Sequence, residues 1–185
     1  MKSLQLFSEQ YNNSPVLDPI PYKETDLEPV ISKQTIDYHF NNLAKTYLKR
    51  YNNNEGDPKF NLAGVYLHNL YFQQFQKPNK ENKPIGISKT IIDQKYNSFT
   101  EFKKQIEKTA MSIQGSGWVY IDTDGEIKTI VNHKIERNIA LIIDWWEHAW
   151  ALDYKQDKKQ YLNNIWSIIN WSIVNTRITS KGNKK

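Results

Sequence analysis

The chain has 185 residues, enough for one domain or for two small units that share an interface. It contains no cysteine, which excludes disulfides, thiolate-bound zinc, iron–sulfur clusters and cysteine nucleophiles. The formal net charge is +5, but the basic excess is scattered or C-terminal and follows no single face, so we expect no nucleic-acid partner.

The N-terminal part is rich in proline and lacks periodicity, and we expect residues 1–20 to form a flexible segment. These residues contain no continuous apolar stretch of the kind found in secretory signals. Nowhere does the sequence approach the roughly 18 consecutive apolar residues that a membrane helix needs. We therefore expect a cytoplasmic protein that makes no contact with a membrane.

Residues 21–78 have the pattern of an α-helical hairpin. Ser32 is a suitable N-cap for a helix that ends near residue 51, along which His39, Leu43 and Tyr47 recur every four residues. The polar run 52–58 then breaks the helix. A second helix is expected over 60–76, with His68 on its apolar stripe.

Residues 79–97 are rich in lysine, asparagine and proline, and their composition is typical of an inter-domain linker. The remainder, 98–185, predicts a helix over 98–112, strands at 118–121, 127–131 and 139–144, and helices over 147–154 and 158–177. The expected fold class is therefore α+β: an N-terminal α-helical hairpin followed by a C-terminal α/β unit with a three-stranded antiparallel sheet.

The most informative local motif follows the third strand, where Asp144 and His148 lie four residues apart. A carboxylate and an imidazole at this spacing can converge on one ion, and a set of one carboxylate with several imidazoles suits iron, manganese or zinc. The chain has only three other histidines, His39, His68 and His133. An isolated Asp–His pair is also common at solvent-facing helix starts, so this pair does not by itself establish a metal site.

Several further motifs, together with this one, resemble those of the iron/manganese superoxide dismutases, and the resemblance extends from about residue 21 to residue 177. The stretches that carry it are Leu27-Glu28-Pro29 with Thr35, His39 and Thr46-Tyr47; Phe60-Asn61, Ala63-Gly64 and His68; Gly115-Ser116-Gly117-Trp118; Asp144-x-Trp146-Glu147-His148-Ala149; and Tyr161, Trp166 and Asn170-Trp171.

The resemblance implies that His39, His68, Asp144 and His148 bind one iron or manganese ion per chain, with a solvent molecule as a fifth ligand. It also implies that superoxide is the substrate. Tyr47 would guard the substrate channel, and Trp118 and Trp146 would line the metal cavity. The resemblance further implies a homodimer, in which Glu147 contacts the ligand histidine of the other subunit.

This sequence departs from the family pattern at four positions. The family places a glutamine near the metal-bound solvent from the second helix or from the sheet; here the helix position is Gly64 and the sheet position is His133. Leu43 and Ala151 replace a histidine and a tyrosine that meet across the dimer in many members. Because both partners of that contact are replaced, no polar side chain is left unpaired, and we expect a dimer interface with different contacts.

Two alternatives to an active dismutase remain. A catalytically silent family member could act as a structural or interaction module, although all four ligand positions are intact. A hydrolytic zinc enzyme could use the same ligands, but the site has no evident general base. Iron and manganese accept the same ligand set, so the sequence leaves the metal open; we favour iron, or the use of either metal.

Overall fold

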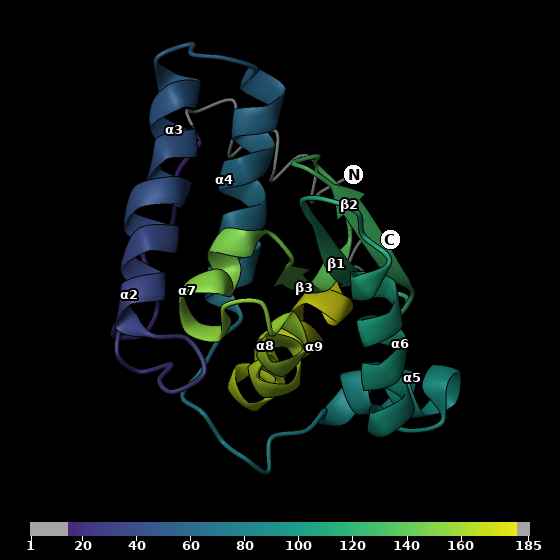
Figure 1. Cartoon of the computed structure of the whole chain (residues 1–185). Coiled ribbons are helices and arrows are strands. Elements are labelled where there is room, and N and C mark those ends of the chain that lie inside the picture. The colour runs from purple at the N-terminus through teal and green to yellow at the C-terminus, as the bar shows by residue number, and fades with distance from the viewer. Residues whose placement is uncertain (1–14, 181–185) are drawn as a thin grey trace.

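In the computed structural model, which describes residues 15–180, the chain begins with the expected helical hairpin (Figure 1). Its first arm runs through α2 (Lys33–Ile36), the π-helical segment η1 (Asp37–Ala44) and α3 (Lys45–Asn52), and its second arm is α4 (Pro58–Gln73). Ser32 Oγ caps the first arm by accepting from Thr35 N–H at 3.1 Å. Asp57 caps α4, where Pro58 occupies the first turn.

The C-terminal part contains two helices followed by a three-stranded antiparallel sheet. The helices are α5 (Gly86–Tyr96) and α6 (Phe99–Met111), and the strands are β1 (Gly117–Asp122), β2 (Ile127–Val131) and β3 (Ile139–Asp144). The strand order is β2-β1-β3, so β1 is central. Every residue of β1 and β3 is buried, whereas β2 is mostly accessible. The predicted fold class is confirmed.

The expectation of a linker over residues 79–97 is wrong for its second half, because α5 occupies residues 86–96. Its Ile92 is buried, and its start is fixed by Asn175 of the last helix. Asn175 Oδ1 accepts from Ser88 N–H at 3.0 Å, and Asn175 Nδ2 donates to Ile85 O at 2.9 Å. These two long-range hydrogen bonds cannot be inferred from the local composition of residues 79–97, which suggested a loop.

The last predicted helix, 158–177, is in fact interrupted. It divides into α8 (Lys158–Ile165), η3 (Trp166–Ile168) and α9 (Trp171–Ser180). At the break Ile169 is extended and forms a β-bridge with Phe75, just beyond α4. The region expected as one helix over 147–154 likewise forms two short pieces, η2 (Glu147–Ala149) and α7 (Ala151–Tyr154).

The N-terminal segment is described only from residue 15; residues 1–14 of the segment expected to be flexible lie outside the described residues. Residues 16–18 are held against α4 by Asn69. Its Oδ1 accepts from Asp18 N–H and its Nδ2 donates to Val16 O, both at 2.8 Å. Within residues 15–180, no helix combines the length and apolar composition needed to cross a bilayer.

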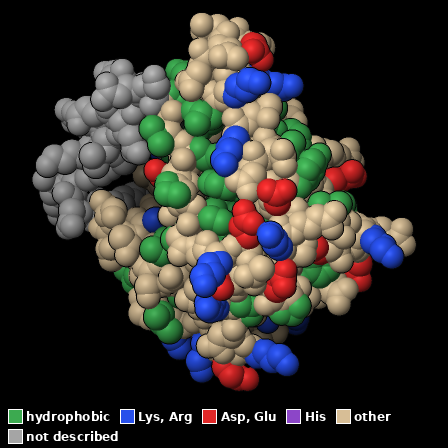
Figure 2. Space-filling view, turned by 90° about the vertical axis from the view of Figure 1, so that its left-hand side faces the viewer, with side chains coloured by type: hydrophobic (Ala, Val, Ile, Leu, Met, Phe, Trp, Pro, Cys, Tyr) green, Lys and Arg blue, Asp and Glu red, His purple; other side chains and the backbone are tan. Residues whose placement is uncertain are grey.

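The core lies where α4, the sheet and the C-terminal helices meet, and large aromatic side chains fill it. The fully buried ones include Trp118, Tyr71, Tyr161, Phe72 and Phe102. On the outer side of the hairpin, Figure 2 shows basic and acidic side chains interspersed over the surface. This agrees with the scattered charge of the sequence and gives no single-sign patch on that face.

Candidate metal centre

Four side chains from separate elements converge between the hairpin and the C-terminal part. His39 comes from η1, His68 from α4, Asp144 from the end of β3, and His148 from η2. Each offers one ligand atom, and these four atoms lie within 4.8 Å of one another. The structure therefore brings together all four residues that the sequence predicted as metal ligands.

Asp144 Oδ2 lies at the middle of the group. It is 3.1 Å from His39 Nε2, 3.3 Å from His148 Nε2 and 3.9 Å from His68 Nε2. The side chains of His39, His68 and Asp144 are at most 1% exposed, whereas that of His148 is 12% exposed. The group is thus enclosed on three sides, and His148 forms its accessible edge.

Hydrogen bonds from the backbone orient two of these side chains. Asp144 Oδ1 accepts from Trp146 N–H at 2.8 Å, which leaves Oδ2 directed at the histidines. His68 Nδ1 lies 2.6 Å from Gly64 O and therefore donates its proton there, because a carbonyl can only accept. The lone pair of His68 Nε2 then faces the centre, as metal binding requires.

The electrostatics of the group favour neutral imidazoles at His39 and His68 beside an ionised carboxylate. Burial, reinforced by His148, lowers the pKa of His39 to about 4. Burial, reinforced by His39, lowers the pKa of His68 well below its usual value. Burial acts to raise the pKa of Asp144, but the neighbouring imidazoles of His148 and His39 outweigh it and lower that pKa. These are the protonation states in which the side chains bind a metal.

The buried nitrogens also indicate that the group fits a metal ion. His39 Nε2 and His68 Nε2 are both buried and lack a hydrogen-bond partner among the described residues. A buried polar atom without a partner costs free energy, and a bound cation would compensate for that cost at both positions. Imidazole nitrogens with one carboxylate oxygen form a donor set suited to iron, manganese or zinc.

A ring of aromatic side chains surrounds the four residues, and the other predicted site residues belong to it. The Tyr47 ring lies 5.5 Å from the His68 ring and 4.6 Å from the His133 ring. Trp118 lies 5.1 Å from His68, and Trp146 lies 5.6 Å from His148. Burial, followed by the charge of Asp144, raises the pKa of Tyr47 to about 12, so its hydroxyl stays protonated at neutral pH.

His133 lies inside this ring, not on the surface beyond the hairpin. It is 7% exposed, and both ring nitrogens are buried without a hydrogen-bond partner among the described residues. Its ring stands 4.7 Å from Trp146, 4.6 Å from Phe60 and 5.6 Å from His68. Burial lowers the pKa of His133 to about 4, so the ring is neutral and can donate one hydrogen bond and accept another.

Glu147 lies beside the centre but faces outward. It is exposed, and with His148, Trp146 and Trp150 it lines a hollow of about 380 Å³. Leu43 of η1 and Ala151 of α7 are each half-buried. The structure thus places Glu147 at the accessible edge of the centre.

Sequence reasoning missed two tyrosines behind the centre. Tyr161 OH donates to Asp144 O at 3.1 Å, and Tyr71 OH lies 3.0 Å from Tyr161 OH. Both are fully buried, and the Tyr71 ring is 5.4 Å from His39. Tyr161 was noted among the residues that carry the family resemblance but was given no role, and Tyr71, three residues after His68, carried no distinguishing signal.

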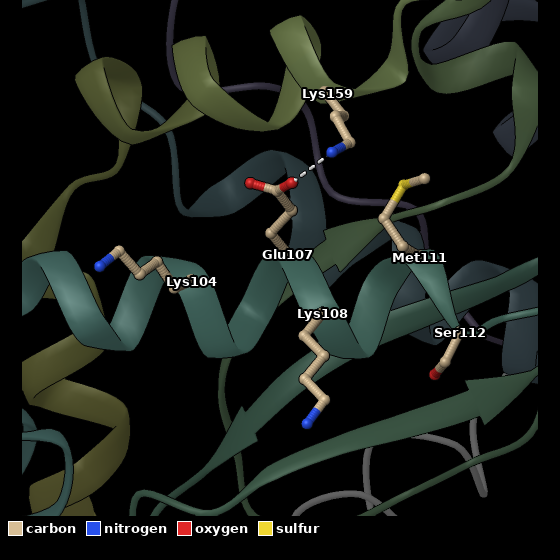
Figure 3. A pocket seen from close by; sticks show the side chains of 6 residues that line it. All are labelled: Lys104, Glu107, Lys108, Met111, Ser112 and Lys159. Carbon is tan, nitrogen blue, oxygen red and sulfur yellow. Dashed lines mark ion pairs between the residues drawn. The ribbon is translucent and has the colours of Figure 1, made fainter.

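A second hollow, of about 510 Å³, lies between α6 and α8 and shares no residue with the centre. Figure 3 shows that its walls carry Lys104, Lys108 and Lys159, with Lys159 paired to Glu107 at 2.9 Å. Its lining has no pair of convergent histidines or buried carboxylates. The four-residue group therefore remains the candidate functional site.

Comparison with known proteins agrees with this geometry. The family model "Iron/manganese superoxide dismutases, C-terminal domain" matches residues 84–177, and "Iron/manganese superoxide dismutases, alpha-hairpin domain" matches residues 16–59. The chain is 33% identical to "Superoxide dismutase [Fe]" of Saccharolobus solfataricus, over 95% of this chain and 97% of that protein. It is 34% identical to "Superoxide dismutase [Mn/Fe]" of Porphyromonas gingivalis, over 85% of this chain and 96% of that protein.

A third relative is "Superoxide dismutase [Fe]" of Bacteroides fragilis, which is 32% identical over 86% of this chain and 96% of that protein. The two family models cover His39, Asp144 and His148 but not His68, which lies between them, whereas the match to the Saccharolobus solfataricus protein extends over 95% of this chain and spans all four residues. On this evidence the chain belongs to the iron/manganese superoxide dismutase family.

Proposed function

We propose that this protein is a superoxide dismutase in which His39, His68, Asp144 and His148 hold a single iron or manganese ion. The observation that carries the proposal is the convergence of four ligand atoms within 4.8 Å, in a site that is closed except at His148. The names of the relatives, which specify iron or manganese with iron, support the same metals.

When bound, the ion supplies one-electron chemistry by alternating between its +3 and +2 states. One superoxide gives up an electron and leaves as O₂, and a second takes up that electron with two protons and leaves as H₂O₂. The protein must therefore keep the ligands neutral or anionic as required, exclude bulk water, and supply protons at the accessible edge. The lowered pKa values of His39 and Asp144 meet the first requirement.

We assign the remaining tasks to the surrounding ring. Tyr47, with its pKa raised to about 12, retains a proton and stands beside His68 and His133, where it can gate access and take part in proton delivery. His133 has two buried nitrogens available to hydrogen-bond a solvent molecule held by the metal. Trp118 and Trp146 lower the local polarity around two of the ligands.

We further propose a two-fold homodimer in which Glu147 accepts a hydrogen bond from His148 of the partner subunit. Glu147 is exposed in the single chain, and it lies next to the only ligand that is measurably accessible. A carboxylate on the free nitrogen of a metal-bound histidine fixes its orientation and basicity. Leu43 and Ala151 would give this interface an apolar contact where many relatives have a polar one.

Reconstitution tests the proposed function directly. Metal-free protein is loaded with iron and, separately, with manganese, and metal content and superoxide consumption are measured on the same samples. We expect close to one ion per chain and activity with at least one metal. Asp144→Ala, which removes the central ligand, should retain little metal, whereas Lys104→Ala, at the second hollow, should match the original protein.

The same experiment separates the alternatives. Full loading with both metals but no activity would identify a catalytically silent member of the family. A further sample loaded with zinc and assayed for ester hydrolysis tests the hydrolase alternative, which zinc-dependent activity would favour. Of the metals themselves, we favour iron, or the use of either, because His133 replaces the usual glutamine.

A further inference from the structure

The first arm of the hairpin is not a regular α-helix around His39, the proposed metal ligand that it carries. The π-helical segment η1 contains His39 and ends three residues before Tyr47. Its hydrogen bonds reach one residue further than those of an α-helix, as in the bond from Lys45 N–H to Phe40 O. Such segments are rare and are frequently found at functional sites.

This segment changes the direction in which Tyr47 points relative to His39. On an α-helix, with about 3.6 residues per turn, a residue eight positions further on points about 80° away from the first. A π-helical turn takes up about one additional residue, which rotates Tyr47 back toward the side of His39. The contacts reflect this alignment: the rings of His39 and Tyr47 lie 5.0 Å and 5.5 Å from the same ring, that of His68.

Two adjacent asparagines on the outer side of η1 form side-chain hydrogen bonds that hold this segment. Asn42 Nδ2 donates to Asp37 O at 3.2 Å, with the same five-residue spacing as the surrounding backbone bonds. Asn41 Nδ2 lies 2.9 Å from Asp37 Oδ1 and 2.9 Å from Glu24 Oε1, and it donates to both. Neither asparagine belongs to the core, because Asn42 is exposed and Asn41 is half-buried. Asparagine is also a weaker α-helix former than alanine, so both residues disfavour a regular helix here.

We propose that Asn41 and Asn42 are positioning residues that hold the π-helical turn, and that this turn sets Tyr47 in phase with His39 at the metal centre. The inference rests on the proposed function for the role of Tyr47 as a gate to the metal. The geometry of the turn itself does not depend on that role.

The test uses the full-length, iron-loaded protein and the double variant Asn41→Ala/Asn42→Ala. Loss of the side-chain bonds, with alanine favouring a regular helix, should speed deuterium exchange of the backbone amides of residues 41–45 by about tenfold, measured by mass spectrometry. The affinity of the iron for azide, a small anion followed by visible absorption, should change severalfold because Tyr47 shifts. The single variant Asn42→Ala gives the same readouts should the double variant not fold.

Asn53→Ala is the matched control. Asn53 is an exposed asparagine at the end of α3, and its side chain donates to Glu55 Oε1 at 2.9 Å. It should leave exchange at residues 41–45 and azide affinity unchanged. Unaltered exchange in the double variant overturns the proposal, and so does faster exchange with azide affinity within twofold of the original. If both readouts change but the original iron-loaded protein does not consume superoxide, the positioning role stands and the proposed function fails.

Discussion

Gly64 of α4 lies directly against the ring of His133. A Cβ at position 64 would come within 3.0 Å of His133 Nδ1 and within 2.8 Å of Tyr47 Cγ. The missing side chain on the helix therefore makes room for the imidazole from the sheet side and for the tyrosine. The two positions at which this chain departs from the family pattern, Gly64 and His133, therefore belong to the same packing arrangement.

His133→Gln tests whether this arrangement sets the choice of metal. A donor directed at metal-bound solvent favours hydroxide, in the oxidised state, over water, and so lowers the reduction potential. Manganese has the higher intrinsic potential and needs more lowering, so exchanging an imidazole for an amide should alter the ratio of iron-supported to manganese-supported activity. Activity per bound metal is measured for both loaded forms. An unchanged ratio would assign His133 a structural role only.

Gly64→Ala should disturb the same arrangement from the other side. The added methyl group cannot be accommodated without moving Tyr47 or His133, and overpacking of this kind costs about 1–3 kcal/mol of unfolding free energy. Urea unfolding measures the cost, and azide affinity of the loaded protein reports the shift of Tyr47. Ala63→Gly, at the preceding buried position, reports the effect of helix propensity together with the loss of one buried methyl group. A Gly64→Ala protein as stable as the original would contradict the close packing.

Local patterns were sufficient to predict much of this fold. Ser32 and Ser98 mark helix starts that the structure has, and the continuous apolar run before Asp144 identified β3 at its observed bounds. The features that were missed depend on distant partners. Neither the break at Ile169 nor the Tyr161 bond behind Asp144 has a local signal, because one is fixed by Phe75 and the other by the path of β3.

At the site, too, the features with a local sequence signal were predicted and those that depend on distant partners were not. The spacing of Asp144 and His148, together with the resemblance to the family, predicted residues that the structure brings together. The π-helical turn around His39 could not be predicted, since a heptad or 3.6-residue pattern does not distinguish i→i+4 from i→i+5 bonding. Its support comes in part from Glu24, which lies outside the helix, 17 residues before Asn41.

Glu147→Ala should weaken dimerisation and metal retention together. If Glu147 accepts a hydrogen bond from His148 of the partner subunit, its removal takes away an intersubunit contact and frees the ligand ring at once. Light scattering and metal content on the same preparation measure both effects. Glu101→Ala, an exposed glutamate paired with Lys104, should change neither. A Glu147→Ala protein that remains dimeric with full metal would count against the contact.

The metal-free protein should lose stability as the pH falls from about 6.5 toward 4. The pKa of His133 lies at about 4 in the fold but near 6.5 in the unfolded chain, so the unfolded chain binds more protons between these values. The unfolding free energy should therefore decrease on acidification, by about 2 kcal/mol between pH 7 and pH 5 for this residue. His39, with a pKa of about 4, adds to the decrease. Urea titrations at both pH values measure it, and His133→Gln should show a smaller decrease; an equal one would refute the assignment.

Arg177 should be important for stability although it is not one of the four converging residues. Its guanidinium donates to Leu70 O at 2.8 Å and to Ala140 O at 3.3 Å, joining the helix that carries His68 to the strand that ends at Asp144. Burial lowers its pKa to about 10, so it remains charged at neutral pH. Arg177→Met removes these bonds and leaves buried carbonyls without a partner, which should cost about 2–4 kcal/mol of unfolding free energy.

Thermal and urea unfolding of the metal-loaded protein measure this loss, with the exposed Arg137→Met as a matched control that should be neutral. Because the hydrogen bonds of Arg177 go to Gln74, Leu70 and Ala140 and not to any of the four converging residues, activity per bound metal should stay close to that of the original. A variant with unchanged stability would show that the two carbonyls find other partners. A stable variant with reduced activity per metal would instead show that the spacing of α4 and β3 is adjusted through Arg177.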